Sequence, residues 1–155
     1  MKAYFGLPAE SFVSGGTHVT VSLVPVYEGR LCVFDVHARE ARGRWLPWDV
    51  LGFGENPYEA ASTLADEWCD GVISDLSLVD VMSFPVDGGG WELAIVFRAE
   101  LSALPRGDDA RAPYLFEAGR YDALGNFDPV DLERWVTSGA APRGETAQER
   151  TGLIF

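Results

Sequence analysis

Positive charge and cysteine are both scarce in this 155-residue chain. Lysine and arginine together number 12, against 24 aspartates and glutamates, so the formal net charge is −12 at pH 7. Charge of this sign repels nucleic-acid phosphates and no basic stripe compensates for it, so we expect no nucleic-acid partner. The chain also lacks an apolar run of about 18 residues, which excludes a membrane-spanning helix and predicts no membrane partner.

Cysteine occurs twice, at Cys32 and Cys69, and the two are far apart and outside any CxxC pair. One disulfide between them is arithmetically possible, but buried free thiols in a reducing compartment are favoured. The segment before Glu10 has one lysine and no apolar core, so it does not resemble an ordinary secretory signal. These features together predict a cytoplasmic protein.

The chain has enough apolar residues for one folded domain. Hydrophobic residues make up 47% of it, which is typical of globular proteins and not of disordered ones. A chain of this length favours a single domain. We expect a lead-in segment at residues 1–16, one domain at 17–138 and a tail at 139–155.

Alternating apolar residues predict two strand hairpins. The first pairs residues 18–27 with 31–37 and the second pairs 72–84 with 91–101. Pro25 favours a strand edge or a bulge at its position, because proline cannot donate to a ladder. Residues 38–44, 45–54 and 105–112 are expected to be loops, and one short strand is expected within 114–124.

Two helices are expected between and after these hairpins. Asn56 is a good N-cap residue and Pro57 suits the first helical position, so a helix should run from Pro57 to about Cys69 and end before Gly71. A second helix should begin at Asp128–Pro129 and run roughly through Val136. Hairpins mixed with helices predict an α+β fold, with a mixed β-sheet covered on both faces in an α/β/α sandwich.

Acidic residues fill the middle of the chain. Between Trp45 and Phe97 there is no lysine, arginine or histidine, and there are ten acids. Such a stretch attracts divalent cations, or it is a solvated surface that aids solubility. Just before it, the only local candidates for binding phosphate form a cluster of Arg39, Arg42 and Arg44.

Few residues suggest nucleophilic or thiol chemistry. No Ser-His-acid arrangement is visible, and the two histidines, His18 and His37, are expected to be surface or loop residues rather than bases or ligands. Aromatic side chains gather around the acidic stretch, where they either stack a base or pack in the core: Trp45, Trp48, Phe53 and Trp68.

The region around the first helix resembles the Nudix family. Trp45-Leu46-Pro47 matches the start of the family's Leu-Pro-Gly-Gly turn, and Gly54-Glu55 follows at the family's spacing. Residues 56–61, Asn-Pro-Tyr-Glu-Ala-Ala, match the usual entry to the box helix. The hairpins and the last helix also fall in the family's order, so the resemblance covers roughly residues 17–137. It implies the Nudix fold and pyrophosphohydrolase chemistry that depends on Mg²⁺ or Mn²⁺.

The chemical positions of the family box, Gly-x5-Glu-x7-Arg-Glu-U-x-Glu-Glu-x-Gly-U with U aliphatic, depart from the family pattern here. Without a gap, the two glycines of the turn become Trp48 and Asp49. Of the box acids Glu55 and Glu67 remain, and Leu64 and Trp68 stand at two acid positions. Two carboxylates make a poor cage for a hard divalent cation, so Glu55 and Glu67 are weak metal candidates.

Helix geometry leaves open two alignments of this helix with the family box, which we call the ungapped and the shifted register. At about 100° per residue, the acids of the helix share one arc, and Leu64 and Trp68 share the opposite arc with the alanines. If one position is deleted after Ala61, Thr63, Asp66 and Glu67 take the three acid positions instead. A deletion inside a helix rotates everything beyond it by about 100°, which usually has to be repaired nearby.

Three functions follow from the resemblance and from these departures. The preferred one is a Nudix-fold protein with a degenerate box that binds a small nucleotide-like ligand or a partner without hydrolysis and needs no cofactor. The runner-up is a metal-dependent pyrophosphohydrolase that uses Glu67 and Asp66 with Mg²⁺ or Mn²⁺. The third is a structural or regulatory homodimer. Ligand contacts are expected from a small set of residues: Trp48, Asp49, Arg44 and Trp68.

The chain ends in Leu153-Ile154-Phe155 after a polar stretch. Three large apolar residues are costly to leave in water, so we expect them to dock on a subunit surface of a homodimer. Truncation after Gly144 should then shift the sedimentation coefficient from dimer toward monomer. Identical monomeric sedimentation of the full and truncated chains would contradict this expectation.

Overall fold

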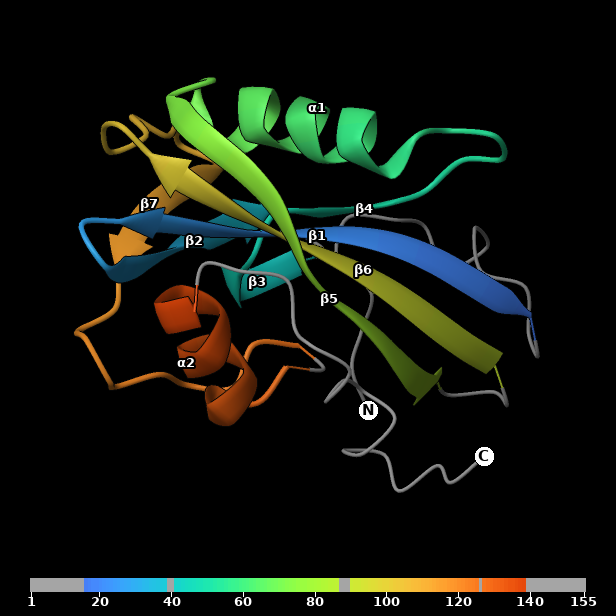
Figure 1. Ribbon diagram of the computed structural model, residues 1–155. Helices are drawn as coiled ribbons and strands as arrows, with labels where there is room; N and C mark the ends of the chain where they lie inside the picture. The colour runs from blue at the N-terminus through green and yellow to red at the C-terminus, as the bar shows by residue number, and fades with distance from the viewer. Residues whose placement is uncertain (1–15, 39–40, 87–89, 126, 139–155) are drawn as a thin grey trace.

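The computed structural model describes residues 16–38, 41–86, 90–125 and 127–138 (Figure 1). The elements in chain order are β1 (Thr17–Tyr27), β2 (Arg30–Ala38), β3 (Ala41–Trp45), β4 (Trp48–Val50), α1 (Pro57–Cys69), β5 (Ile73–Val86), β6 (Gly90–Leu101), β7 (Arg111–Leu115) and α2 (Pro129–Ser138). Most of the expected lead-in and all of the expected tail, with its apolar end, lie outside the described residues. Among the helices described, none is long and apolar enough to cross a membrane.

β1 is the central strand of a mixed sheet whose main order is β3-β2-β1-β6-β5. It runs parallel to β6 from Thr17 opposite Trp91 to Val26 opposite Glu100. All the other pairings are antiparallel, including the expected hairpins β1–β2 and β5–β6. On its other side β1 changes partner along its length, because β4 pairs with its first half and β2 with its end.

Pro25 lies where β1 changes partner. On that side β4 reaches only to Ser22, and β2 begins to pair at Val26. Leu23, which has the same strand parity as Pro25, donates its N–H to the carbonyl of Pro47 at 2.9 Å. The missing N–H of Pro25 therefore faces the gap between β4 and β2, so a proline is tolerated within a central strand.

The two faces of the sheet carry separate apolar cores. Val21 and Leu23 of β1 pack with the buried side of α1, whereas Val24 and Val26 pack with α2. Figure 1 shows α1 above the sheet and α2 below it. This is the α/β/α sandwich with a mixed sheet that the sequence predicts.

The first helix has the predicted bounds and the predicted cap. The side chain of Asn56 accepts the N–H of Tyr58 at 2.9 Å, Pro57 opens the helix, and Asp70 ends it in the left-handed region at φ 55°. One side of α1 is buried, and it comprises Ala60, Ala61, Leu64, Ala65, Trp68 and Cys69. The period of apolar residues was therefore sufficient to predict both the helix and its buried face.

Three segments expected to be loops contain strands instead. β3 begins in the expected loop at 38–44 and ends one residue after it. It pairs antiparallel with β2 from Ala38 to Phe34. β4 lies within the expected loop at 45–54, and β7 begins at Arg111, ahead of the expected strand. These short strands carry little alternation of their own, because pairing with a neighbour rather than local propensity makes them strands.

A bulge in β5 turns Asp80 toward α2. Leu78 pairs with Phe97, and the next paired residue is Asp80, opposite Val96. Phe97 belongs to the core under α1 and Val96 to the core under α2, so the extra residue, Val79, moves the rest of the strand to the other face.

There Asp80 holds α2 against the sheet. Its side chain is fully buried, and it accepts hydrogen bonds from the guanidinium of Arg134 and, at 3.0 Å, from the indole N–H of Trp135. Arg134 also lies 3.7 Å from a carboxylate oxygen of Asp131. A buried carboxylate with two donors is stable only while all three groups remain together.

Replacement of Asp80 by alanine should lower the free energy of unfolding by about 3–5 kcal/mol, because the part-buried Arg134 loses its shorter carboxylate contact and the buried indole N–H of Trp135 loses its acceptor. Urea unfolding followed by circular dichroism measures this loss. The control is Asp75→Ala, an exposed acid of the same strand, for which a change within about 0.5 kcal/mol is expected. Equal losses in the two variants would show that the network does not stabilise the fold.

Candidate functional site

The two faces of α1 separate its acids from its apolar residues. Glu59, Asp66 and Glu67 are exposed, whereas the side chains of Leu64 and Trp68 are 2% and 7% exposed. This is the arrangement expected from helical geometry. Asp66 and Glu67 are neighbours on the water-facing side of the helix and could still act together there. Leu64 and Trp68 contribute to the core and offer no ligand to a metal ion.

Glu55 braces the turn that precedes α1. Its carboxylate accepts the N–H of Gly52 at 2.9 Å, and its own N–H donates to the carbonyl of Gly52 at 3.1 Å. The turn presents Phe53 at its tip, where the side chain is fully exposed. The carboxylate of Glu55 therefore has a local structural task in this conformation.

Trp68 lies between an aromatic ring and a guanidinium. Phe34 of β2 contacts it edge-on with ring centroids 5.4 Å apart, and the guanidinium of Arg111 lies 4.2 Å from the indole centroid. Arg111 opens β7 after a tight loop in which Asp108 accepts the N–H groups of Arg111 and Ala110. These two hydrogen bonds lower the pKa of Asp108. A cation over this ring is a favourable contact that fixes Trp68 in the core.

The loop before β7 depends on Gly107, whose φ is +68°. A Cβ atom there would approach the carbonyl oxygen of Arg111 to 2.5 Å. The backbone N–H of Arg106 also donates to the carboxylate of Asp70 at 2.7 Å, which ties this loop to the end of α1. The position of Arg111 over Trp68 is therefore set by the loop as well as by β7.

The other expected ligand residues are spread over several elements. Trp48 of β4 is half-buried, lies opposite Ser22 and packs against the core under α1. Asp49 is exposed, and its carboxylate accepts the N–H of Val50. Arg44 of β3 is exposed and pairs with Asp35 of β2 at 3.0 Å. On β2, Asp35 alternates with Phe34, so it lies on the face away from α1 and Trp68.

Arg44 belongs to a surface cluster with Asp35 and Tyr114. Its guanidinium lies 3.7 Å from the ring centroid of Tyr114 and 5.9 Å from that of Phe116. The hydrogen bond that Arg44 donates to the carboxylate of Asp35 raises the pKa of Arg44 above its ordinary value. The positive charge of Arg44 is thus already matched by one carboxylate, which weakens it as a phosphate ligand.

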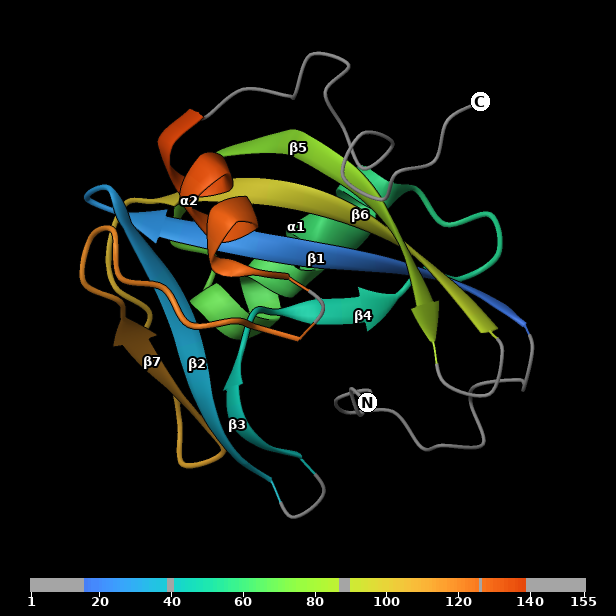
Figure 2. The same ribbon diagram turned by 90° about the horizontal axis from the view of Figure 1, so that it is seen from below.

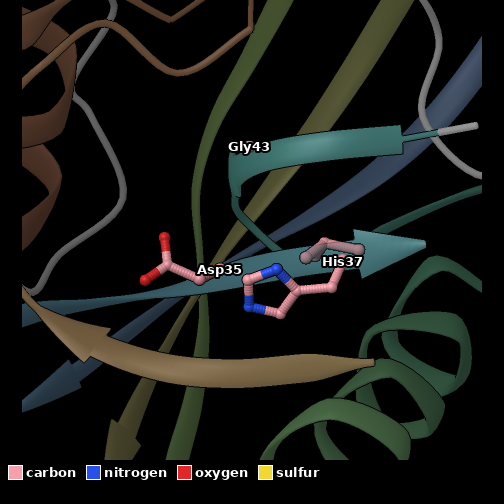
Figure 3. A pocket seen from close by; sticks show the side chains of 4 residues that line it. Asp35, His37 and Gly43 are labelled. Carbon is pink, nitrogen blue, oxygen red and sulfur yellow. The ribbon is translucent and has the colours of Figure 1, made fainter. Parts of the chain in front are cut away.

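A hollow of about 350 Å³ lies beside this cluster. It is lined by Asp35, Val36, His37 and Gly43. Figure 3 shows Asp35 and His37 projecting from β2, with Gly43 on β3 alongside. His37 is exposed, as the sequence predicts. The hollow can admit a small polar molecule, but it lies on the face of β2 opposite to the acids of α1.

The expectation for the other histidine was wrong. His18 is only 9% exposed and lies within β1, so it is neither a surface nor a loop residue. It forms a buried group with Thr20, Ser22 and Glu92, which we call the polar row. The signal was available as alternate polar positions in residues 18–22, but that pattern is typical of a strand with one face in water.

A divalent cation is the cofactor that the box resemblance implies, and the described residues do not fit it. Within 16–38, 41–86, 90–125 and 127–138, no three His, Cys, Asp or Glu side chains gather closely enough to hold a metal ion. Glu55 is engaged by Gly52, and Glu67 lies on the exposed side of α1. Mg²⁺ requires near-octahedral oxygen ligation, which this donor set does not offer.

Solved structures of other proteins share this architecture. A MutT Nudix hydrolase from Burkholderia pseudomallei matches with a TM-score of 0.59 at 21% identity, over 76% of this chain and 96% of that one. The chain has the Nudix fold. The MutT protein from Methanosarcina mazei also matches, with a TM-score of 0.58 at 14% identity over 80% and 96% of the two chains.

These likenesses establish the fold alone. An ADP compounds hydrolase matches at 17% identity with a TM-score of 0.49 over 64% of this chain, and the match spans only 56% of that protein. No protein-family model matches this Nudix-fold chain, and no curated protein matches its sequence.

Both cysteines are buried free thiols, as the sequence predicts. Burial raises the pKa of Cys32 to about 12. Burial also raises the pKa of Cys69, and the neighbouring Cys32 and Asp70 add to this effect. A thiol with a raised pKa stays protonated at neutral pH and is a poor nucleophile.

These pKa shifts predict a loss of stability in alkali. Thiols of the unfolded chain ionise at about pH 8.5, so the unfolded state loses its protons before the folded state does. The contribution of the thiols is therefore complete below that pH and is lost as the pH rises toward about 12, by up to about 1.4 kcal/mol per pH unit for each thiol.

Urea unfolding at about pH 7 and at about pH 10.5 measures this loss. The control variant, Cys32→Val with Cys69→Val, keeps the core apolar and removes both titrations, so it should lose less stability between the two conditions. Parallel losses in wild type and variant would exclude the thiols as the cause.

Proposed function

We propose that this Nudix-fold protein binds a small nucleotide-like ligand, or a partner, without hydrolysing it. The observation that carries the proposal is the burial of Leu64 and Trp68 in the core beneath α1. In the ungapped register these residues stand where the family has two of its carboxylates. Apolar side chains there remove ligands and lower the local dielectric, which further disfavours a bound cation.

The loss of metal ligands should have a large effect on hydrolysis. Phosphoryl chemistry of this type needs metal ions that neutralise the phosphates and orient the attacking water. The ungapped register leaves Glu55 and Glu67, and the carboxylate of Glu55 already accepts the N–H of Gly52. Each missing ligand should cost several kcal/mol in metal binding and transition-state stabilisation, which is enough to abolish useful turnover.

The exposure of Asp66 and Glu67 supports a second candidate, the metal-dependent pyrophosphohydrolase. In the shifted register they are the two remaining carboxylates, with Thr63 as a third oxygen ligand. All three lie on the exposed side of α1. A metal bound there would be weakly held, because two carboxylates and one hydroxyl provide few of the ligands that Mg²⁺ prefers.

Wild-type protein should therefore bind Mg²⁺ and Mn²⁺ weakly or not at all in calorimetry. It should release no phosphate from nucleoside diphosphate derivatives above the uncatalysed rate, even with metal present, because the carboxylates are too few. Micromolar metal binding together with turnover that is lost on Glu67→Gln would reject the proposal. That result would establish the hydrolase, and loss of turnover on Asp66→Asn as well would assign the shifted register, because Glu67 is an acid position in both registers.

A gain-of-binding variant tests the register directly. Leu64→Glu combined with Trp68→Glu should increase the affinity for Mn²⁺ if these positions once held the metal. Near-ultraviolet dichroism has to accompany the titration, because both residues belong to the core. The control pair, Thr63→Glu with Glu59→Gln, changes only exposed positions of the same helix and should not produce the same gain.

A further inference from the structure

The half of the sheet beyond α1 exposes apolar side chains on the face that this helix covers elsewhere. Figure 1 and Figure 2 show the starts of β1 and β6 and the end of β5 extending past α1. Phe97 and Ala99 of β6 belong to the core under α1, so alternation along the strand places Trp91, Leu93 and Ile95 on the same face. The apolar face of the sheet therefore continues past the helix.

The strand registers define this surface, which we call the apolar strip. Ile95 is opposite Val81 of β5, and Leu93 is opposite Val19 of β1. Residues that are directly opposite one another share a face, so all of them lie on the α1 side of the sheet. The apolar strip consists of Val19, Val81, Trp91, Leu93 and Ile95.

The side chains of the apolar strip are open to solvent. Val81 is 40% exposed and Trp91 is 45% exposed, and the other three are half-buried. The indole N–H of Trp91 donates to the hydroxyl of Ser83, which holds the ring in place on the sheet. At the α1 end of the strip, Tyr58 is 51% exposed and packs edge-on against Phe97 with ring centroids 4.7 Å apart. Contiguous apolar surface of this kind marks a place where another molecule binds.

The surroundings of the apolar strip are acidic. All of its residues on β5 and β6, and all of α1, lie within residues 46–96, the segment that contains acids and no lysine, arginine or histidine. Asp49 of β4 is exposed and lies in the same row of the sheet as Ile95, because both are opposite Val21 of β1. Glu59 is exposed in the first turn of α1. A positively charged partner would therefore be attracted to the edges of the strip.

The charge of the molecule limits what can cover this surface. The net charge of −12 opposes a second copy of the chain, which carries the same charge, and it opposes a membrane surface of anionic lipids. Nucleic acid is disfavoured for the same reason. Exposed aromatic rings, here Trp91 and Tyr58, attract cations and guanidinium groups in particular. Apolar area and negative charge together favour a cationic amphipathic segment of another protein.

We propose that the apolar strip binds a cationic amphipathic segment of a partner protein, with the apolar side chains of that segment on the strip and its positive charges toward the surrounding acids. The inference deepens the proposed function, on which it rests, by stating the chemistry of the partner that is bound without hydrolysis. The apolar contacts supply affinity, whereas the acids around the strip select the sign of the partner's charge.

Fluorescence anisotropy of labelled synthetic peptides, titrated with the full chain, tests the proposal. A peptide that alternates leucine and arginine has the leucines on one side of an extended strand and the arginines on the other. It should bind at physiological salt, where exposed charges more than about 8 Å apart are largely screened. Glutamate in place of arginine should abolish binding, and serine in place of leucine should weaken it about tenfold. The proposal is overturned if the leucine–arginine peptide does not bind, or if either replacement leaves binding unchanged.

Two matched variants locate the binding. Val81→Arg and Val130→Arg each replace an exposed valine and change the net charge equally, but Val130 belongs to α2, on the opposite face of the sheet. Val81→Arg places a positive charge within the apolar strip, so it should weaken binding of the leucine–arginine peptide about tenfold more than Val130→Arg does. Equal effects would show general attraction to an acidic chain and would overturn the proposal.

Trp91→Ser gives an independent test that leaves the net charge unchanged. It removes apolar area from the strip, so it should weaken binding of the same peptide about tenfold. If Val81→Arg lowers the unfolding midpoint, Trp91→Ser must by itself reduce the affinity, and unchanged affinity overturns the proposal.

Sedimentation and flotation with phosphatidylserine vesicles test the other occupants. A dimer that Val81→Arg dissociates would assign the apolar strip to a second copy of the chain, and vesicle binding that Val81→Arg removes would assign it to a membrane. Either result overturns the proposal. Absence of peptide binding by an inert protein rejects only this inference, whereas metal-dependent turnover rejects only the proposed function.

Discussion

The parallel pairing of β1 with β6 is the interaction on which the rest of the structure depends. It brings together two strands that are 72 residues apart in sequence at the Thr20–Glu92 contact. Side chains of both strands contribute to the apolar core on each face of the sheet. β2, β4 and β5 pair directly with one of these two strands, both helices pack on their faces, and β3 and β7 attach through β2. Pairing of strands this far apart in sequence forms late in folding and costs much conformational entropy. The nearly continuous burial of β1 offsets this cost.

The two faces of this ladder divide the chemistry of the molecule. The α1 face is apolar where the resemblance would place metal ligands, and it encloses Trp68 between Phe34 and Arg111. The α2 face carries the buried polar groups, in which Asp80 accepts hydrogen bonds from α2 and Glu92 accepts one from Thr20. Acidic groups are costly to bury unless they are paired, and Asp80 meets this condition through its two donors in α2.

Local signals in the sequence predicted the fold well and the site only in part. Asn56 and Pro57 fix the start of α1 through capping chemistry, which depends on a few neighbouring residues. The short strands β3 and β4 exist through pairing with distant partners, and no local pattern marks them. The sequence did not predict the polar row either, because alternating polar residues in β1 are typical of a strand with one face in water. Only the fold shows that this face is covered.

The bulge at Val79 has a consequence for changes in chain length. In residues 76–84 the even positions share one unbroken alternation in the sequence, yet Leu78 faces α1 and Asp80 faces α2. β5 thus holds one residue more than its partner strand opposite this point. Deletion of Val79 would restore a regular ladder and leave both halves of β5 facing as they do. An insertion or deletion elsewhere in residues 76–84 would instead turn one half of the strand over, so within this segment position 79 is the place where a change of one residue keeps the facing of both halves.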